Sequence, residues 1–425
     1  MSFKTISVIG LGYIGLPTAA MFASYKVKVI GVDVSAHVVE TINKGKVHIV
    51  EPDLDLLVQE AVAKGYLKAV TKPEIADAFL IAVPTPFKAC KKGDIPEPDL
   101  RYIESATKAI ASVLKKGDLV ILESTSPVGA TEQMSAWLAE ARPDLSFPQT
   151  AGENADVNIA HCPERVLPGQ VVRELVENDR VIGGLSKRCS ERSVELYKTF
   201  VKGDCVITNA RTAEMAKLTE NSCRDVQIAF ANELSVICDK LDIDVWELIA
   251  LANRHPRINI LQPGPGVGGH CIAVDPWFII SKTPQEAQLI HTARKVNDAK
   301  PEWVINKVKL AIADFLQANP DKTTKDVRIT CFGLAFKPNI DDLRESPSLA
   351  IAQKIAKMHA SVVNFVEPNI HELSEEMSKN SKLISFIGSE DKTDIAVLLV
   401  DHKEFIKADK AVNFAFIVDT KGIWK

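Results

Sequence analysis

The sequence predicts an α/β protein with two Rossmann-like, doubly wound domains joined by a long central helix. Three observations predict this fold: a glycine-rich turn near the N-terminus, a run from 212 to 241 without proline or glycine, and a second alternation of strand and helix patterns from 327 onward. We expect a first Rossmann domain over 1–208, a central helical domain over 209–300 and a C-terminal Rossmann-like domain over 301–425.

Length and charge narrow the class of protein. At 425 residues the chain is too long for one hydrophobic core, so several domains are expected. A net charge of -4 gives no basic surplus for nucleic acid or for an anionic membrane surface. No stretch approaches the ~18 consecutive apolar residues of a membrane helix. We therefore expect neither nucleic-acid binding nor membrane insertion.

The cysteines indicate the cellular compartment. There are eight of them, scattered without a Cys-x-x-Cys pair, which argues against a zinc ribbon, a redox motif or a disulfide scaffold. No metal site is expected. The N-terminus is apolar but rich in glycine, so it indicates a strand and a turn instead of a signal peptide. Reduced thiols in a cytoplasmic protein are the simplest interpretation.

The N-terminal segment carries a dinucleotide-binding pattern. Strand-forming residues over 3–9 lead into the turn Gly10-Leu11-Gly12-Tyr13-Ile14-Gly15, and a helix-compatible run follows. Gly10 permits the tight turn, Gly12 lets the backbone approach a pyrophosphate, and Gly15 lets the helix pack closely on the sheet. The pyrophosphate is then expected at the N-terminus of that helix, where unpaired N–H groups favour an anion.

Asp33 distinguishes between the two common dinucleotides. It ends a second strand over 27–32 and lies eighteen residues after Gly15, where its carboxylate can accept hydrogen bonds from ribose hydroxyls. The same charge repels a 2′-phosphate. The sequence therefore favours NAD over NADP.

Further strands of the first domain bring polar loops to one edge of its sheet. Thr85 and Thr125 lie in loops that follow two of these strands, and ligands bind at the carboxyl ends of strands in such sheets. Both are candidate cofactor contacts, although hydroxyls in turns are common without any function. Segment 87–98 is expected to be a solvated surface excursion. The expected strands are 79–83, 119–122, 157–160 and 181–183, in a largely parallel sheet, and the expected helices are 100–114 and 131–141.

A carboxylate follows another predicted strand of this domain. Glu164 stands in the run Pro163-Glu164-Arg165. It is either half of an ordinary surface pair with Arg165 or a functional acid at the same edge of the sheet as the other loops.

The central helix and the loop after it carry residues suited to covalent chemistry. Lys217 and Asn221 are four residues apart and share one helix face, so they are either a solvated pair or donors to an oxyanion. Four glycines within 264–269 precede Cys271, and Asp275 follows four residues later. A thiol behind such a loop suggests a nucleophile, whereas a lone cysteine is more often a buried small hydrophobe.

The C-terminal region predicts a second nucleotide-type domain with a different ligand. It has no full Gly-x-Gly-x-x-Gly turn, but Lys337 and Arg344 follow its first strand. Arg254 and Arg257, upstream of the glycine-rich loop, could also clamp a phosphate. One domain for the cofactor and another for a phosphorylated substrate fits this pattern. The expected strands are 327–332, 362–366, 395–400 and 414–418, with helices over 304–316 and 349–358.

Taken in order, seven of these segments resemble the UDP-glucose/GDP-mannose dehydrogenase family along nearly the whole chain. The resemblance implies an enzyme that oxidises the C6 primary alcohol of a nucleotide sugar to a carboxylate with two NAD⁺ per turnover. The matching segments are 10–17, 83–86, 124–129, 163–164, 214–221, 263–275 and 333–346.

Departures from the family's pattern narrow the expected substrate. Val274 stands where many members that act on UDP-glucose have a lysine, and the run 268–277 is similar to that of members that act on UDP-N-acetyl-D-mannosamine. The resemblance therefore implies a UDP-N-acetylhexosamine substrate. We expect oxidation to UDP-N-acetyl-D-mannosaminuronate for a bacterial surface polysaccharide such as enterobacterial common antigen. UDP-N-acetylglucosamine and UDP-glucose remain alternatives.

The resemblance also implies roles for individual residues in catalysis. Cys271 is the expected nucleophile, and Lys217 and Asn221 stabilise the oxyanion of its adduct. Thr125, Lys217 and Asp275 hold an ordered water, and Glu164 or Asp275 activates the water that hydrolyses the thioester.

The remaining roles concern binding. Arg257 is expected to reach the substrate from a second subunit, which implies a homodimer packed along the central helix. The implied cofactor contacts are Gly10, Gly12, Tyr13, Ile14, Gly15, Asp33, Thr85, Thr125 and Arg344, and the implied substrate contacts are Glu164, Arg165, Lys217, Asn221, Arg257, Gly268 and Lys337.

Two other functions are compatible with parts of the sequence. A two-electron dehydrogenase of the β-hydroxyacid type also pairs a dinucleotide domain with a helical domain, but it requires neither Cys271 nor a third domain. A non-catalytic NAD-binding protein would not need the combination of Cys271, Lys217, Asn221 and Asp275.

Overall fold

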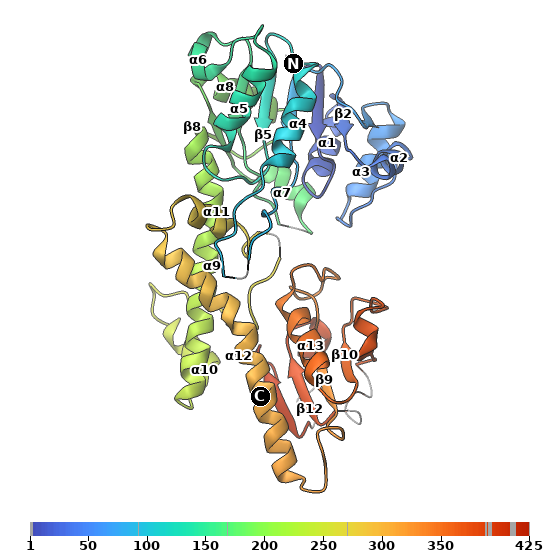
Figure 1. The fold of residues 1–425 in the computed structure, drawn as a ribbon. Coiled ribbons are helices and arrows are strands. Elements are labelled where there is room, and N and C mark those ends of the chain that lie inside the picture. The colour runs from blue at the N-terminus through green and yellow to red at the C-terminus, as the bar shows by residue number, and fades with distance from the viewer. Residues whose placement is uncertain are drawn as a thin grey trace. The chain divides into compact units, whose positions relative to one another are not determined.

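The computed structural model describes residues 3–91, 93–167, 169–269, 271–386, 389, 393–408 and 414–424 (Figure 1). The chain separates into two compact units, each with its own sheet. The first unit holds the chain up to Glu220 together with Trp277–Thr283, and the second holds Asn221–Pro276 together with Pro284–Lys425.

The sheet of the first unit has the Rossmann strand order. Within the described residues its eight strands run β3-β2-β1-β4-β5-β6-β7-β8, and the first six match the 3-2-1-4-5-6 order of dinucleotide-binding folds. Neighbouring strands are parallel except β6 and β7, which pair antiparallel. The strands are β1 (Thr5–Ile9), β2 (Lys28–Val32), β3 (Leu67–Val70), β4 (Ala78–Ile81), β5 (Leu119–Leu122), β6 (Asn158–His161), β7 (Arg180–Gly184) and β8 (Cys205–Asn209).

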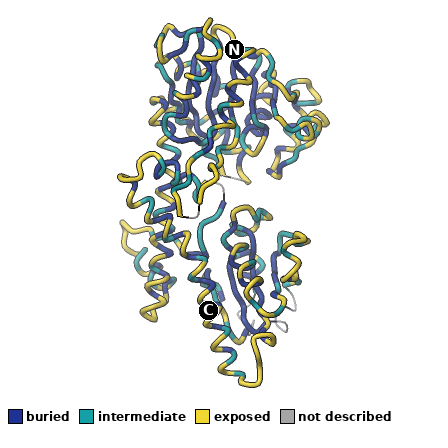
Figure 2. The backbone as a smooth tube through the Cα atoms, viewed as in Figure 1, coloured by how far each residue is buried: buried dark blue, intermediate teal, exposed yellow. Residues whose placement is uncertain are grey.

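Helices cover both faces of this sheet. Ile6 and Leu16 belong to a buried cluster on one face, whereas Ile9 and Met134 belong to a separate cluster on the other. Figure 2 shows the strands as buried segments between exposed loops. The helices are α1 (Gly15–Ser24), α2 (Ala36–Asn43), α3 (Leu54–Ala63), α4 (Arg101–Ala111), α5 (Ala130–Ala141), α6 (Pro148–Ala151), α7 (Val171–Glu177) and α8 (Lys187–Tyr197), with the 3-10 turn η1 (Gly152–Asn154).

Four helices follow the first sheet: α9 (Ala210–Lys240), α10 (Val245–Ala252), α11 (Asp275–Lys282) and α12 (Gln288–Ala318). Helix α9 begins two residues before the predicted position. The helix predicted over 304–316 is too short, because α12 begins at Gln288 and continues through Pro301. Asn297 and Val304 on its two sides are buried, so packing against α9 stabilises the helix across the proline.

The second unit contains a parallel sheet with the order β11-β10-β9-β12-β13 in the part of the chain described. This order repeats that of the first five strands of the N-terminal sheet, so the predicted fold class of two Rossmann-like domains and a long helix is confirmed. The elements are β9 (Ile329–Phe332), α13 (Pro347–Met358), β10 (Val363–Val366), η2 (Met377–Lys379), β11 (Ser381–Leu383), β12 (Ile395–Leu398), α14 (Lys403–Lys407) and β13 (Phe416–Asp419).

Two further predictions can be compared with the structure. Among the described residues, no helix is both long and apolar enough to cross a membrane. The segment 87–98, of which Lys92 lies outside the described residues, is mostly exposed as expected. It is closed by a bridge between Phe87 and Pro98, and the Phe87 ring packs edge-on against Phe278 with centroids 5.8 Å apart.

Candidate active site

The glycine-rich turn after β1 has the geometry that a dinucleotide requires. Gly10 has a φ of +90°, and a Cβ there would lie 2.6 Å from the carbonyl oxygen of Ala82. A Cβ on Gly15 would overlap the Gly10 carbonyl oxygen at 1.8 Å, whereas one on Gly12 would meet nothing within 4 Å. Helix α1 begins without a side-chain cap at Ile14. The open side at Gly12 and the uncapped helix N-terminus fit a pyrophosphate.

Asp33 connects this turn to the end of β2. Its Oδ2 accepts from the Leu11 backbone N–H at 3.0 Å, and its Oδ1 accepts from that of Ser35 at 2.9 Å. Each oxygen keeps a second lone pair for a ribose hydroxyl. His48, which the sequence analysis did not select, lies close by, and its pKa is lowered by burial against the opposing charge of Asp33. Its Nδ1 is buried without a hydrogen-bond partner.

The two hydroxyl-bearing loops lie at the carboxyl ends of adjacent strands. Ser124, after β5, donates to the carbonyl oxygen of Val83, after β4, at 2.7 Å. Thr125 is half-buried beside it. The Thr85 hydroxyl is buried without a protein partner, which leaves it available to a ligand. The structure therefore brings both predicted threonine loops together at this edge of the sheet.

Glu214, near the start of α9, caps helix α5 with its carboxylate. It accepts from the backbone N–H groups of Gly129 at 2.7 Å and Thr131 at 2.8 Å. Its pKa is raised because burial outweighs these hydrogen bonds. Glu214 thereby fixes the end of the Thr125 loop to α9.

Glu164 is buried and paired, unlike an ordinary surface acid. Only 6% of it is exposed, and its Oε2 accepts from Arg180 NH1 at 2.6 Å. Its Oε1 accepts from the backbone N–H of Arg165 at 2.7 Å. The Arg165 side chain turns away from Glu164 and pairs with Glu220 at 2.6 Å.

Two more side chains surround this pair. Tyr197 donates to Glu123 Oε1 at 2.6 Å, and its ring lies 5.2 Å from the Arg180 guanidinium carbon. Burial, reinforced by the nearby charge of Glu164, raises the pKa of Glu123 to about 7. With the buried Cys162, five ionisable groups therefore lie close together, at the edge of the sheet where ligands bind in such folds.

In the second unit, Asn221 and Asp275 meet directly. Asn221 Nδ2 on α9 donates to Asp275 Oδ2 at 2.5 Å, and Asp275, at the start of α11, is only 3% exposed. The Asp275 backbone N–H donates to the Cys271 carbonyl oxygen at 2.9 Å. Cys271 is solvent-exposed, so it is not the buried small hydrophobe of the alternative interpretation. Lys217, one turn before Asn221 on α9, is half-buried.

The glycines before Cys271 allow close contact with the first loop of the C-terminal sheet. A Cβ on Gly268 would lie 2.5 Å from the Glu345 carbonyl oxygen, and one on Gly269 would lie 3.0 Å from the Phe336 ring. His270 lies outside the described residues. The start of the loop is held by Asn232 on α9, whose Oδ1 accepts from the Gly264 backbone N–H at 2.9 Å. Sequence reasoning missed Asn232, although its i+11 spacing from Asn221 places it on a similar helix face.

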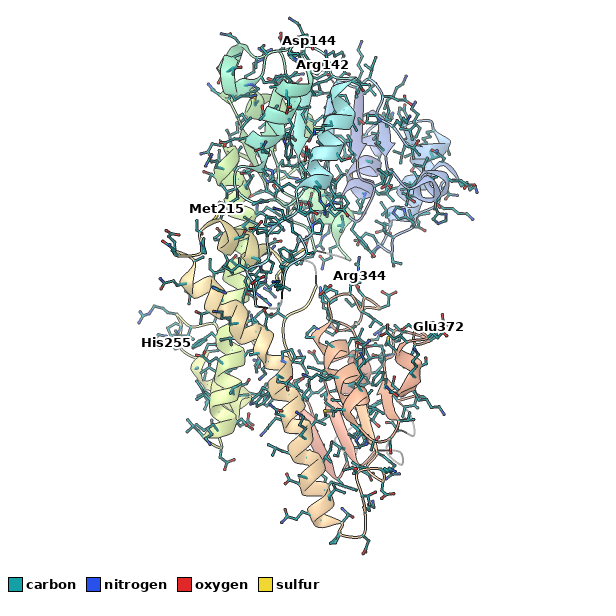
Figure 3. The ribbon with its side chains drawn as sticks, in the orientation of Figure 1. Arg142, Asp144, Met215, His255, Arg344 and Glu372 are labelled. Carbon is teal, nitrogen blue, oxygen red and sulfur yellow. The ribbon has the colours of Figure 1, made fainter. Side chains whose placement is uncertain are left out.

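Lys337 and Arg344 lie on this same loop after β9, and both are exposed. The side chain of Arg344 is labelled in Figure 3. Its guanidinium is oriented by Asp342, which accepts at 2.8 and 2.6 Å. Arg257 is exposed in the segment after α10, close in sequence to His255. These basic side chains suit phosphate groups.

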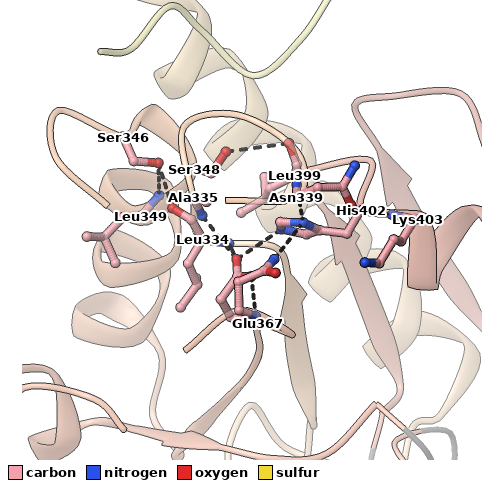
Figure 4. A network of polar contacts seen from close by, with 11 residues as sticks. Leu334, Ala335, Asn339, Ser346, Ser348, Leu349, Glu367, Leu399, His402 and Lys403 are labelled. Atoms are coloured by element: carbon pink, nitrogen blue, oxygen red, sulfur yellow. Dashed lines mark hydrogen bonds and ion pairs between the residues drawn. The ribbon is translucent and has the colours of Figure 1, made fainter. Parts of the chain in front are cut away.

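A buried pair fixes the base of the Lys337 loop. Glu367, at the end of β10, accepts from the backbone N–H groups of Leu334 at 2.7 Å and Ala335 at 3.1 Å, and it pairs with His402 at 3.0 Å (Figure 4). Glu367 occupies the topological place that Asp33 has in the first sheet. Because the imidazole of His402 covers this carboxylate, the second domain does not offer it to a ribose.

Metal ligands are not grouped in this structure: the described residues contain no cluster of three or more His, Cys, Asp or Glu side chains with metal-binding geometry.

Comparisons with known proteins place these features in a family. The sequence matches the UDP-glucose/GDP-mannose dehydrogenase family in its NAD binding domain over residues 4–201, its central domain over 211–299 and its UDP binding domain over 330–425. The chain is 67% identical to the UDP-N-acetyl-D-mannosamine dehydrogenase of Yersinia pestis over 427 residues, which cover 100% of both chains. It is 59% identical to the NDP-N-acetyl-D-galactosaminuronic acid dehydrogenase of Ralstonia nicotianae, with 100% of this chain and 97% of that one covered.

A solved structure agrees. The UDP-D-ManNAc dehydrogenase from Pyrococcus horikoshii superposes with a TM-score of 0.85 at 36% identity, covering 99% of this chain and 96% of that one. The fold and the glycine-rich turn after β1 thus define a dinucleotide-dependent dehydrogenase with a second nucleotide-type domain. The chain belongs to the UDP-glucose/GDP-mannose dehydrogenase family, and the prediction of NAD as cofactor is confirmed by the NAD binding domain.

Proposed function

We propose that this protein is an NAD-dependent UDP-N-acetyl-D-mannosamine 6-dehydrogenase. The product is UDP-N-acetyl-D-mannosaminuronate, for a bacterial surface polysaccharide such as enterobacterial common antigen. The observation that carries the proposal is the contact of Asn221 with the buried carboxylate of Asp275, one helical turn from the exposed thiol of Cys271. The full-length relatives named for UDP-N-acetyl-D-mannosamine support this sugar.

The first oxidation takes the C6 alcohol to an aldehyde. One NAD⁺ would accept the hydride of this oxidation, and a second NAD⁺, bound after the first NADH has left, would accept that of the next. The residues of the chain handle the proton: Lys217 and Asp275, with the Thr125 hydroxyl, hold the ordered water that accepts it. Gly10, Gly12, Gly15 and Asp33 would hold the dinucleotide, together with Tyr13, Ile14 and Thr85, and Arg344 is a further proposed contact.

The second oxidation needs the thiol. Cys271 attacks the aldehyde carbon and forms a thiohemiacetal, whose oxyanion accepts hydrogen bonds from Lys217 and Asn221. Loss of the second hydride leaves a thioester on the sulfur. Glu164, or Asp275, then removes a proton from water, and the attack of that water releases the carboxylate and restores the thiol.

Basic residues bind the rest of the substrate. Lys337 and Arg257 suit the diphosphate, and Gly268 and Arg165 are further proposed contacts of the substrate.

We propose that Arg257 comes from a second subunit of a cytoplasmic homodimer. In support, α9 and α10 carry exposed apolar side chains: Phe230 is 52% exposed and Leu251 is 59% exposed. Such surfaces are typical of interfaces between proteins.

The first unit adds a further apolar surface. Helices α5, α9 and α11 enclose an open groove of about 1200 Å³, with Met215 of α9 in its wall (Figure 3). Sedimentation of the protein should give a dimer mass, and Phe230→Glu should shift it toward the monomer. A monomeric wild-type protein with full activity would exclude the contribution of Arg257 from a second subunit.

The sugar is tested by a panel of substrates. The protein is incubated with NAD⁺ and UDP-N-acetyl-D-mannosamine, UDP-N-acetylglucosamine, UDP-glucose or UDP-N-acetylgalactosamine. We expect the highest kcat/KM with the first. Cys271→Ser should stop formation of the uronate while NAD⁺ binding is nearly unchanged, and a loss of NAD⁺ affinity in that variant would count against the role of the thiol.

A further inference from the structure

Strand β7 is reversed relative to the strands before it, and this reversal places a buried arginine beside Glu164. In the antiparallel pairing of β6 with β7, Ala160 lies opposite Gly184 and His161 opposite Gly183. Continuing this register brings the first residue of β7, Arg180, to the end of β6 where Glu164 lies. A parallel strand would have brought its last residue to this edge instead.

The guanidinium of Arg180 serves Glu164 in particular. It is only 3% exposed and donates to Glu164 Oε2 at 2.6 Å, while its Nε is buried without a hydrogen-bond partner. It lies against the Tyr197 ring instead of a second carboxylate. Because this buried cation has one short ionic contact, with Glu164, we interpret its position as serving the Glu164 carboxylate.

We propose that Arg180 is a positioning residue that holds the Glu164 carboxylate in the orientation it needs as the base for thioester hydrolysis. This inference rests on the proposed function, because it assumes that Glu164 activates the hydrolytic water. With Oε2 bound by Arg180 and Oε1 by the Arg165 backbone, the carboxylate is held in one orientation. Each oxygen retains a lone pair that can accept a proton from water.

Four other ionisable side chains surround Glu164. They are Glu123 after β5, Cys162 after β6, Arg180 on β7 and Tyr197 on α8. Arg180 is the cation among them. Without it, Glu164 Oε2 would lose its hydrogen-bond donor, and the carboxylate would no longer be held in one orientation. Hydrolysis would then be slow, whereas both oxidations would continue until Cys271 is acylated.

The test uses the full-length protein mixed rapidly with saturating NAD⁺ and UDP-N-acetyl-D-mannosamine. In Arg180→Met we expect a burst of two NADH per active site and then a slow phase, with hydrolysis about 10²-fold slower. Acid-quenched protein should carry the sugar on Cys271 by mass spectrometry. Arg180→Lys, which keeps the charge, should recover part of the rate.

Two further variants serve as controls for the Arg180→Met result. Arg142→Met is a matched control: Arg142 lies in the same unit and donates to the carbonyl oxygen of Ala111 at 2.8 Å. It should show no burst, even if its stability falls. Glu164→Gln should show the burst and then a slow phase, because the proposed base for hydrolysis has been removed.

The outcomes separate the two claims. If Glu164→Gln shows no burst, the proposed role of Glu164 fails. If Glu164→Gln shows a burst but folded Arg180→Met turns over like wild type, the inference about Arg180 is wrong. A reduced NADH amplitude without a changed ratio of burst to steady rate would show a structural role only and would also overturn it.

Discussion

Asn221 and Asp275 are 54 positions apart in sequence but are joined by a hydrogen bond of 2.5 Å between the amide nitrogen and the carboxylate oxygen. This contact links the central helix to the first turn after the cysteine loop. Because Asp275 is buried, the position of its carboxylate is coupled to that of the Asn221 side chain. The positions of Asn221, the proposed oxyanion donor, and Asp275, the proposed proton acceptor, therefore depend on each other.

Asn221→Ala should lower activity strongly and leave the fold intact. Loss of one oxyanion donor typically reduces kcat by about 10²–10³-fold. We expect a reduction of this size in steady-state turnover of UDP-N-acetyl-D-mannosamine. The circular dichroism spectrum and NAD⁺ affinity should be unchanged. An activity within twofold of wild type would exclude Asn221 from the reacting centre.

Asp33→Ala should weaken NAD⁺ binding more than NADP⁺ binding. The substitution removes the acceptor for ribose hydroxyls and also the charge that repels a 2′-phosphate. Hydrogen bonds to charged groups contribute about 1.5–3 kcal/mol, so NAD⁺ affinity should fall at least about tenfold. Titration by fluorescence with each dinucleotide measures the ratio. Equal weakening of both would remove the argument for the role of Asp33 in cofactor choice.

Glu123→Gln should stabilise the protein at alkaline pH. Burial raises the pKa of Glu123 to about 7 from 4.5, so the folded state holds a proton that the unfolded state releases. Stability is therefore greatest below the unfolded value and falls as the pH rises through the folded value. A shift of this size corresponds to about 3 kcal/mol.

Urea unfolding at pH 5 and pH 8 tests this prediction. The difference in unfolding free energy between Glu123→Gln and wild type should favour the variant by about 1–3 kcal/mol more at pH 8 than at pH 5. A pH-independent difference would mean that Glu123 ionises normally.

His161→Leu should reduce sensitivity to acid. His161 is 1% exposed, both ring nitrogens lack hydrogen-bond partners, and burial lowers its pKa to about 3. In the unfolded state His161 binds a proton near pH 6.5, whereas in the folded state it stays neutral at this pH. Stability is therefore lost as the pH falls below 6.5. At pH 5 the loss is about 2 kcal/mol.

Thermal or urea unfolding of His161→Leu should therefore show its largest gain over wild type at pH 5 and a smaller one at pH 8. The matched control is His255→Leu, whose ring is exposed. If both variants respond equally to pH, the buried imidazole is not the cause.

The sequence predicted the parts of the fold that depend on local patterns. Strand β5 and the end of α13 were placed correctly, because buried apolar runs and helix-compatible stretches identify them. Strand β3, at the sheet edge, contains the exposed Lys68, so it lacks the continuous apolar run that marks β5. Strand β8 has Val206 and Ile207 exposed instead of buried in a core. The direction of β7 depends on how the chain returns to the sheet, which no local pattern encodes.

The same reasons limited prediction of the site. Asp33, Glu164, Asn221 and Cys271 belong to motifs whose spacing is visible in the sequence. Arg180 looks like an ordinary charged residue before a strand, and only the reversed pairing of β7 buries it beside Glu164. The proposed domain boundaries, the site roles and the homodimer stay predictions.

The central claim is a four-electron oxidation through Cys271, and the yield of NADH per sugar tests it most directly. With UDP-N-acetyl-D-mannosamine as the limiting reagent and excess NAD⁺, the reaction is run to completion, and NADH and uronate are counted. The account predicts two NADH and one uronate per sugar consumed. One NADH per sugar, with an aldehyde as product, would contradict it and would leave Cys271 without a covalent role.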